Sequence, residues 1–303
     1  MRISEKIKKY LPNEQFEVFN EKDVSTLGFF DCEEETVCCF VGAKKFISRV
    51  PDNAKMLIVP ENLKEDVIKS CDAGVITVKK PQKVFWDLHQ ALEQDLDYVR
   101  DDFENRISST ATIGKFVSIA PRNVVIEDGV VIEDFVTIYE NVHIKRGSII
   151  RSGSRIGSIG FQEIGDGESI STINHYGGVV IGENVDIQNN SCVDKGLFPS
   201  DDTFIGNETK IDNMVHIAHA TRIGSRCEIA ANAVIAGRCI IGDGVWIGLG
   251  VLVRNFVNVG NDSRLNIGSV VVNDVPEGAS VSGNYAIDHN KFMFEQLVRN
   301  RKR

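Results

Sequence analysis

The sequence has few prolines and no apolar segment long enough to cross a membrane. Among its 303 residues are only 7 prolines and 26 glycines, which excludes a proline-rich linker and a collagenous chain. No apolar run approaches the ~20 residues of a membrane-spanning helix, so we expect no membrane span. The segment from Met1 to Tyr10 alternates charged and apolar residues and lacks the apolar core of a signal peptide, which favours a cytoplasmic protein.

Paired cysteines and an excess of basic charge are also missing. The 7 cysteines are odd in number and contain no Cys-x-x-Cys motif, so we expect neither a disulfide framework nor a structural zinc site. Small buried thiols in a reducing compartment are the better interpretation. The net charge is −9, from 43 acidic and 34 basic residues, which argues against a broad nucleic-acid surface.

A six-residue period occupies more than half of the chain. Aliphatic residues recur at every sixth position in the series Ile205, Ile211, Ile217, Ile223, Ile229, Ile235, Ile241, Ile247, Val253, Val259, Leu265 and Val271. Similar series begin at Ile107 and at Ile181. A helix with 3.6 residues per turn cannot keep this spacing on one face, whereas a parallel β-helix does. Three hexads then form one triangular coil of about eighteen residues, with the aliphatic side chains inside. Glycine often follows the aliphatic residue, and we expect these glycines at corners with positive φ.

Two excursions interrupt the period, at residues 157–178 and 194–204, and must loop out from corners of the prism. Residues 1–105 lack the period and alternate short apolar strands with a helix from Pro81 to Leu96, which predicts a small α/β domain. The β-helix is predicted over residues 106–275. Residues 276–303 would form a short basic helix whose Phe292, Phe294 and Leu297 cap the open prism.

The clearest site for chemistry is the segment "DNMVHIAHATRIG", which holds His216 and His219. Eighteen residues after His219 comes Gly237, so the two should lie one coil apart, about 4.8 Å along the prism axis. A base beside an accessible backbone N–H is the minimum requirement for acyl transfer, because the base deprotonates the attacking group and the N–H stabilises the oxyanion. Two histidines alone, without a third ligand at a suitable spacing, do not predict a metal site.

The segments "YGGVVIGENVDIQNNSCVDKG" and "TFIGNETKIDNMVHIAHATRIG" resemble the UDP-3-O-acylglucosamine N-acyltransferase family of lipid A synthesis. The stretch "TVCCFVGAKKFISRVPDNAKMLIVPE" is similar to the uridine-binding domain of that family. This resemblance implies a left-handed β-helix, an N-terminal nucleotide-binding domain and a homotrimer with active sites between neighbouring prisms.

The resemblance also implies roles for individual residues. His219 matches the catalytic base, and Gly237 matches the glycine whose N–H serves as oxyanion donor. Substrate-binding positions are implied for Asp212, Asn213 and His216 on the β-helix and for Phe40, Lys45 and Phe46 in the N-terminal domain. Ala220, Ala43 and the pair Asn255-Phe256 depart from the family pattern, which there has Asn, Asn and Gly-His.

These departures and the short C-terminal tail favour a relative with another substrate. We therefore predict transfer of an acyl group to the amine of a dTDP- or UDP-linked amino sugar, as in lipopolysaccharide or O-antigen synthesis. We expect acyl-CoA as donor, with Arg238 and Arg254 at its phosphates, and no tightly bound cofactor. One alternative is the lipid A enzyme itself, using a hydroxyacyl carrier protein. The other is a non-catalytic scaffold that binds nucleotide sugars.

Overall fold

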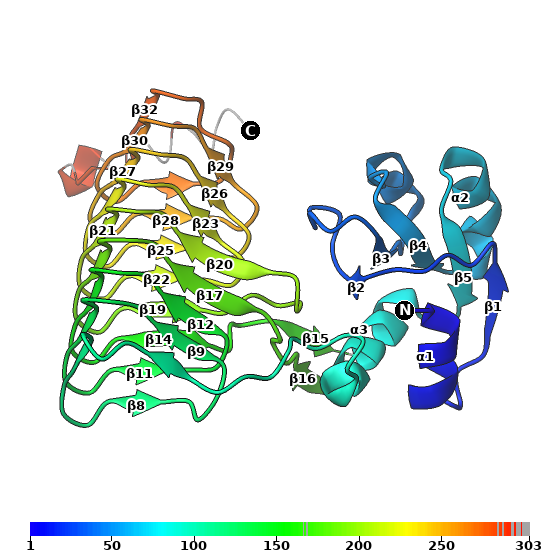
Figure 1. Ribbon diagram of the computed structural model, residues 1–303. Coiled ribbons are helices and arrows are strands. Elements are labelled where there is room, and N and C mark those ends of the chain that lie inside the picture. The colour runs from blue at the N-terminus through cyan, green and yellow to red at the C-terminus, as the bar shows by residue number, and fades with distance from the viewer. Residues whose placement is uncertain are drawn as a thin grey trace.

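The computed structural model describes residues 1–165, 167, 169–283, 285, 286, 288–291, 294 and 298. It consists of a β-helical prism beside a smaller α/β domain, with the hairpin β15 (Glu163–Gly165) and β16 (Ile170–Thr172) between them (Figure 1). None of the helices in these residues has the length and apolar character that a membrane span requires.

The α/β domain contains one five-stranded sheet in the order β1-β5-β4-β3-β2. Its strands are β1 (Phe16–Phe19), β2 (Thr26–Leu27), β3 (Val37–Phe40), β4 (Ala54–Val59) and β5 (Gly74–Val78), and only β1 runs antiparallel to its neighbour. Its helices are α1 (Ile3–Tyr10), α2 (Lys64–Ser70) and α3 (Pro81–Ala91). The sequence predicts α3 as far as Leu96, but the helix ends earlier and Leu96 is 90% exposed.

The prism confirms the predicted left-handed parallel β-helix, which has three parallel sheets as faces. Face 1 contains β6 (Arg106–Ile107), β9 (Val124–Ile126), β12 (Val142–Ile144), β17 (Gly178–Ile181), β20 (Asp202–Ile205), β23 (Arg222–Ile223), β26 (Ile240–Ile241) and β29 (Asn258–Val259). Face 2 contains β7 (Thr112–Ile113), β10 (Val131–Ile132), β13 (Ile149–Ile150), β18 (Asp186–Ile187), β21 (Lys210–Ile211), β24 (Glu228–Ile229), β27 (Trp246–Ile247), β30 (Arg264–Leu265) and β32 (Ser280–Val281). Face 3 contains β8 (Ser118–Ile119), β11 (Thr137–Ile138), β14 (Arg155–Ser158), β19 (Cys192–Asp194), β22 (His216–Ile217), β25 (Val234–Ile235), β28 (Leu252–Val253) and β31 (Val270–Val271).

The aliphatic hexad residues form the core of the prism. Ile217 pairs with Ile235 on face 3, and Ile223 pairs with Ile241 on face 1. Residues eighteen positions apart therefore stack one aliphatic side chain on another. The stacked side chains are almost completely buried, and their removal from water stabilises the coils at roughly 25 cal/mol per Å². The last paired strand, β32, carries the β-helix to Val281, beyond the predicted end at residue 275.

The backbone angles at the corners contradict the expectation that glycine occupies the positions with positive φ. From Glu208 to Gly268 one residue in six has positive φ, and most of these residues are not glycine; Ala220 has φ 55° and Arg238 has φ 61°. The glycine after the aliphatic residue serves another purpose. A Cβ added at Gly206 would lie 2.4 Å from the backbone carbon of Gly224 in the next coil, so the close approach of coils requires glycine there.

Both excursions leave the prism at the corner between face 3 and face 1. We call this the insertion corner; it comprises residues 157–177, 195–201, 218–221 and 236–239 in four successive coils. From these loops Ile173, Leu197 and Phe198 enter the core of the α/β domain. His89 of α3 completes the junction, because its Nε2–H donates to the carbonyl of Asn174 over 2.9 Å.

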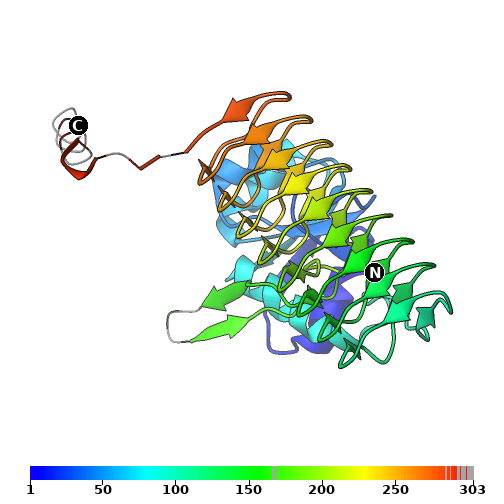
Figure 2. The same ribbon diagram turned by 90° about the vertical axis from the view of Figure 1, so that its left-hand side faces the viewer.

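The predicted C-terminal cap lies largely outside the described residues, which include neither Phe292 nor Leu297. Among those described, Phe294 is 67% exposed and therefore does not close the end of this prism. The described residues after Val281 extend away from the last coil (Figure 2).

Candidate active site

The structure brings His219 and Gly237 together at the insertion corner. His219 follows β22 and Gly237 follows β25, which are neighbouring strands of face 3. A Cβ added at Gly237 would lie 2.7 Å from both Cε1 and Nε2 of His219, so the imidazole rests on the backbone of this glycine. Only a residue without a side chain permits this contact.

The second feature of this corner is the backbone N–H of Gly237. The neighbouring residues are held by coil-to-coil bonds, since Arg238 N–H donates to the His219 carbonyl over 3.0 Å and Phe256 N–H donates to the Gly237 carbonyl over 3.2 Å. No acceptor for the Gly237 N–H occurs within the described residues. A fixed, unpaired N–H next to an imidazole can donate to an oxyanion that forms there.

The surroundings of His219 keep its imidazole neutral. Burial and, to a smaller extent, the charge of nearby Arg238 lower the pKa of His219 to about 4, while Asp194 opposes the shift. Three residues earlier, His216 points outward from β22 and its Nε2 lies 2.9 Å from a carboxylate oxygen of Asp194. That hydrogen bond raises the pKa of His216. The pKa values of the two histidines are therefore shifted in opposite directions, and the neutral ring of His219 has no carboxylate bound to it in the described part of the chain and can accept a proton from a substrate.

A second histidine beside His219 was not predicted. His175, in the first excursion, is 3% exposed, and its ring centroid lies 5.4 Å from that of His219 at an interplanar angle of 76°. Gly160, from the same loop, packs against both rings, because its added Cβ would lie 3.0 Å from His219 Cδ2 and 3.1 Å from His175 Nε2. The six-residue period does not extend into the loop, so the sequence contained no spacing that could place His175 there.

Arg238 does not serve as the predicted phosphate ligand. Its side chain is 5% exposed and forms bonds of 2.7 and 2.8 Å with the carboxylate of Asp31 and of 2.6 Å with Asp201. The guanidinium is thus saturated by two carboxylates and joins the prism to the α/β domain. Arg254, one coil further along the insertion corner, is exposed, and its role at the acyl donor stays a prediction.

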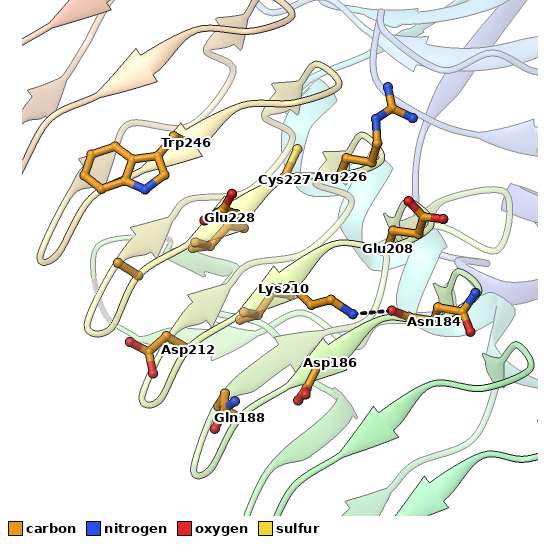
Figure 3. Close-up of a pocket in the computed structure, with 13 residues that line it drawn as sticks. Asn184, Asp186, Gln188, Glu208, Lys210, Asp212, Arg226, Cys227, Glu228 and Trp246 are labelled. Atoms are coloured by element: carbon orange, nitrogen blue, oxygen red, sulfur yellow. Dashed lines mark hydrogen bonds between the residues drawn. The ribbon is translucent and has the colours of Figure 1, made fainter.

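Asp212 and Asn213 lie at a different corner, between faces 2 and 3. Asp212 accepts from the side chain of Asn213 over 2.6 Å and from the N–H of Ala231 over 3.1 Å. Asp212 also lines a hollow of about 780 Å³ on face 2, together with Lys210 and Trp246 (Figure 3). This hollow contains neither His219 nor Gly237, so the structure does not bring Asp212 and Asn213 to the candidate base within one chain.

The predicted nucleobase residues lie near a second groove without lining it. Phe40 packs against Phe85 with centroids 5.0 Å apart, and the Lys45 ammonium lies 5.1 Å from the half-buried ring of Phe46. A groove of about 840 Å³ separates α3 from the hairpin β15–β16. It is lined by Gly42 of the same loop and by polar side chains that include Lys80, Gln82, Gln90 and Ser171. Within the described residues, no group of three His, Cys, Asp or Glu side chains is arranged to hold a metal ion.

Comparisons with known proteins agree with the repeat architecture. Residues 123–158 and 202–237 match the family "Bacterial transferase hexapeptide (six repeats)". No curated protein sequence gives a significant match to the chain.

Several solved structures are similar in part. One is a UDP-N-acetylglucosamine O-acyltransferase from Moraxella catarrhalis, with 25% identity over 63% of this chain and 76% of that chain and a TM-score of 0.48. Another is a UDP-N-acetylglucosamine acyltransferase from Bacteroides fragilis, with 30% identity over 57% of this chain and 67% of that chain and a TM-score of 0.38. A third is a GDP-perosamine N-acetyltransferase variant from Caulobacter crescentus, solved with CoA and GDP-perosamine, with 14% identity over 82% of this chain and 77% of that chain and a TM-score of 0.21.

These TM-scores are all below 0.5, so the solved structures do not identify the substrate of this chain. At residues 123–158 and 202–237, the chain carries the hexapeptide repeats of bacterial transferases.

Proposed function

We propose that this protein is an acyltransferase that moves an acyl group from a thioester to the amine of a nucleotide-linked amino sugar. The observation that carries the proposal is the contact of the neutral His219 imidazole with the backbone of Gly237, whose N–H is unpaired within the described residues. A neutral base and a fixed donor are what attack on a thioester carbonyl needs.

The reaction follows from these two groups. The sugar amine attacks the thioester carbonyl while His219 accepts one of its protons. The oxyanion of the tetrahedral intermediate receives a hydrogen bond from the Gly237 N–H. When the C–S bond breaks, the protonated His219 returns its proton to the leaving thiolate, which gives an amide and a free thiol.

The groove between α3 and the hairpin β15–β16 supports a nucleotide-linked acceptor. It holds Lys80 and the polar side chains Gln82, Gln90 and Ser171, and a loop of the same hairpin excursion carries Gly160 and His175 to the base. A nucleotide in this groove would contact α3 on one side and, through Ser171, the excursion that carries Gly160 and His175 on the other. The uracil or thymine of UDP or dTDP, and Phe40, Lys45 and Phe46 near it, are part of the proposal.

We propose acyl-CoA as donor, with Arg254 near its phosphates. Arg254 is exposed at the insertion corner, whereas Arg238 is already paired.

A homotrimer is also part of the proposal. Exposed apolar side chains gather on the later coils, on face 3 and on the corner before it: Leu249 at 49%, Leu252 at 45%, Ile267 at 51% and Val270 at 63% exposure. Asn213 precedes Leu249 by two coils at that corner, and His216 precedes Leu252 by two coils on face 3. Face 3 lies between the Asp212 corner and the insertion corner, so a second copy packed against this surface would adjoin both corners. Substitution of Leu252 and Val270 by Asp should then yield monomers in light scattering.

The test of the function is His219→Ala, with His143→Ala as the matched control. His143 is an outward histidine of face 1 that pairs with Glu127 over 2.6 Å and lies outside the site. Purified protein is incubated with acetyl-CoA or a longer acyl-CoA and with UDP- and dTDP-linked amino sugars, and amide product is measured by mass spectrometry. We expect His219→Ala to lower kcat about 10²–10⁴-fold and His143→Ala to retain the wild-type rate. A near wild-type rate in His219→Ala would show that His219 is not the base.

A further inference from the structure

Two buried ring nitrogens at the insertion corner lack hydrogen-bond partners in the part of the chain that the structure describes. They are Nδ1 of His219 and Nε2 of His175, and among the buried side-chain nitrogen and oxygen atoms of the described residues only these two are unsatisfied. A buried polar atom without a partner has lost its hydrogen bonds to water without replacement, so two such atoms on neighbouring rings require an explanation.

The hydrogen-bond chemistry of His175 is fixed by its other nitrogen. Nδ1 of His175 lies 2.9 Å from the carbonyl of Ile173, and a carbonyl can only accept. Nδ1 therefore carries the proton, and Nε2 presents a lone pair. Burial, followed by the proximity of His219, lowers the pKa of His175 to about 4, which keeps this ring neutral. His175 Nε2 is thus an acceptor that needs a donor.

The proposed function places the opposite requirement on His219. If Nε2 of His219 accepts the proton of the substrate amine, then Nε2 must be bare and Nδ1 must carry the ring proton. Nδ1–H is then a buried donor that needs an acceptor. An imidazole base with an unsupported Nδ1–H readily shifts to the other neutral tautomer, which cannot accept at Nε2.

One rotation of the His219 ring would turn its Nδ1 toward the side on which His175 lies, where the two ring centroids are 5.4 Å apart. A turn of 180° about Cβ–Cγ exchanges Nδ1 with Cδ2 and Nε2 with Cε1, and leaves the outline of the ring unchanged. Nδ1 then occupies the Cδ2 position, 3.0 Å from the point where a Gly160 Cβ would lie, and His175 Nε2 is 3.1 Å from the same point. Because Cε1 and Nε2 are both 2.7 Å from the corresponding point at Gly237, Nε2 faces the oxyanion donor in either orientation.

We propose that His175 is a positioning residue whose Nε2 accepts the Nδ1–H of His219 and holds this histidine in the tautomer that acts as base. Gly160 is part of this arrangement, because a side chain at this position would contact both histidine rings. The catalytic effect of this hydrogen bond rests on the proposed function. Whether the hydrogen bond forms does not depend on the reaction.

The direct test is nitrogen NMR of the full chain labelled with ¹⁵N-histidine, at pH 7 and without substrate. In the wild type we expect His219 as the Nδ1–H tautomer, with a slowly exchanging proton. In His175→Phe, which keeps an aromatic ring but offers no acceptor, the Nε2–H tautomer of His219 should become the major form. His175→Gln retains an acceptor oxygen and should restore the Nδ1–H form. If His219 has the same tautomer in the wild type and in His175→Phe, the proposal is wrong.

The kinetic test separates positioning from folding. His175→Phe should lower kcat about 10²-fold with KM changed less than about threefold, and His175→Gln should recover most of the rate. Gly160→Ala adds a methyl group between the rings and should lower kcat while leaving the α/β domain intact. Asp194, Lys195, His216 and Arg238, the other charged or titratable groups that act on the two rings, are unchanged in all three variants. Equal loss of rate in His175→Phe and His175→Gln would overturn the positioning role.

The two hypotheses can fail separately. If the wild type transfers no acyl group from any thioester to any amino sugar, the proposed function is wrong, and the NMR comparison still decides the hydrogen bond. If transfer depends on His219 but NMR shows the Nε2–H tautomer of His219 in the wild type, the proposed function stands and the hydrogen bond from His219 to His175 is wrong.

Discussion

The imidazole of His219 lies directly on the backbone of Gly237, with Cε1 and Nε2 both 2.7 Å from the position that a Cβ of Gly237 would occupy. The two residues are eighteen positions apart and come from equivalent points of adjacent coils. The proposed base and oxyanion donor are therefore held together by the coil-to-coil pairing of the prism, not by a mobile loop.

Gly237→Ala should remove activity with little loss of stability. Gly237 is not among the glycines with positive φ, so alanine can adopt its backbone conformation, but the new methyl group displaces the His219 ring and covers the N–H. We expect kcat to fall about 10²–10³-fold, as for the loss of an oxyanion donor. Thermal unfolding measured alongside should change by only a few degrees. Retention of the wild-type kcat would show that the N–H is not used.

On the acidic side of the pH–rate profile, the rate should fall at a pH far below the pKa of an ordinary histidine. Because the pKa of His219 is lowered to about 4, the base is already deprotonated at pH 6. Values of kcat/KM, corrected for the fraction of the acceptor present as free amine, should thus be flat between pH 6 and pH 7.5 and fall only as the pH approaches 4. An acid limb centred near the ordinary histidine pKa of ~6.5 would contradict the burial of His219.

Protein stability should decrease over the same acidic range. Burial lowers the pKa values of His89, His175 and His219 to about 4, so between ~6.5 and 4 the unfolded chain binds protons that the folded chain does not. The free energy of unfolding therefore falls as the pH is lowered through this window. His216, whose pKa is raised, acts in the opposite direction and loses its contribution as the pH rises through its folded pKa. Urea unfolding at pH 7.0, 5.5 and 4.5 gives the net sign, and constant stability would refute the prediction.

Arg238→Met should destabilise the protein strongly and change the titration of His219. Removal of the guanidinium leaves the carboxylates of Asp31 and Asp201 without their buried partner, at a cost of about 3–5 kcal/mol. It also removes a positive charge that lowers the pKa of His219, so the acid limb should move to higher pH.

Arg222→Met is the matched control for that substitution. Arg222 joins the same two parts of the molecule through Glu33, but both side chains are more than half exposed. Its loss should cost no more than about 1 kcal/mol in denaturant unfolding. Equal effects of the two substitutions would mean that burial of the Arg238 network does not matter.

Ala220→Asn should stabilise the insertion corner. Ala220 has φ 55°, a left-handed conformation that costs alanine roughly 1–2 kcal/mol and that asparagine tolerates better. We expect a gain of about 0.5–1 kcal/mol in the free energy of unfolding. Ala230→Asn, at a corner position without positive φ, should give no gain in the same experiment. A similar gain from both would point to an effect of the amide side chain itself.

The sequence predicted the prism because its signal is periodic. Each inward position repeats the same physical requirement, an aliphatic side chain stacked on another, so the registers of Ile217, Ile235 and Val253 could be found without coordinates. The alignment of His219 with Gly237 follows from that register. The corner geometry was predicted less well, because the positive φ falls on residues such as Arg238 and Phe256, whose side chains give no sign of it.

The remaining parts of the site depend on contacts between segments distant in the sequence. His175 reaches His219 from an excursion without a period, and Arg238 is buried because Asp31 of the other domain lies opposite. Neither contact has a spacing in the sequence. The resemblance implied a substrate-binding role for Asp212, but the seven residues from Asp212 to His219 span about one prism face, so within one chain the two lie at different corners.

The confinement of both excursions to one corner has a consequence for how such a protein can change. Each coil contacts only the coils above and below it, so a whole coil of eighteen residues, for example 124–141, could be deleted with only local loss of core. The prism would become shorter while His219 and Gly237 stayed aligned. The two loops can likewise vary in length and composition without altering the inward aliphatic columns. Apart from Gly160 and His175, which contact the His219 ring, the two loops can therefore change without moving His219 away from Gly237.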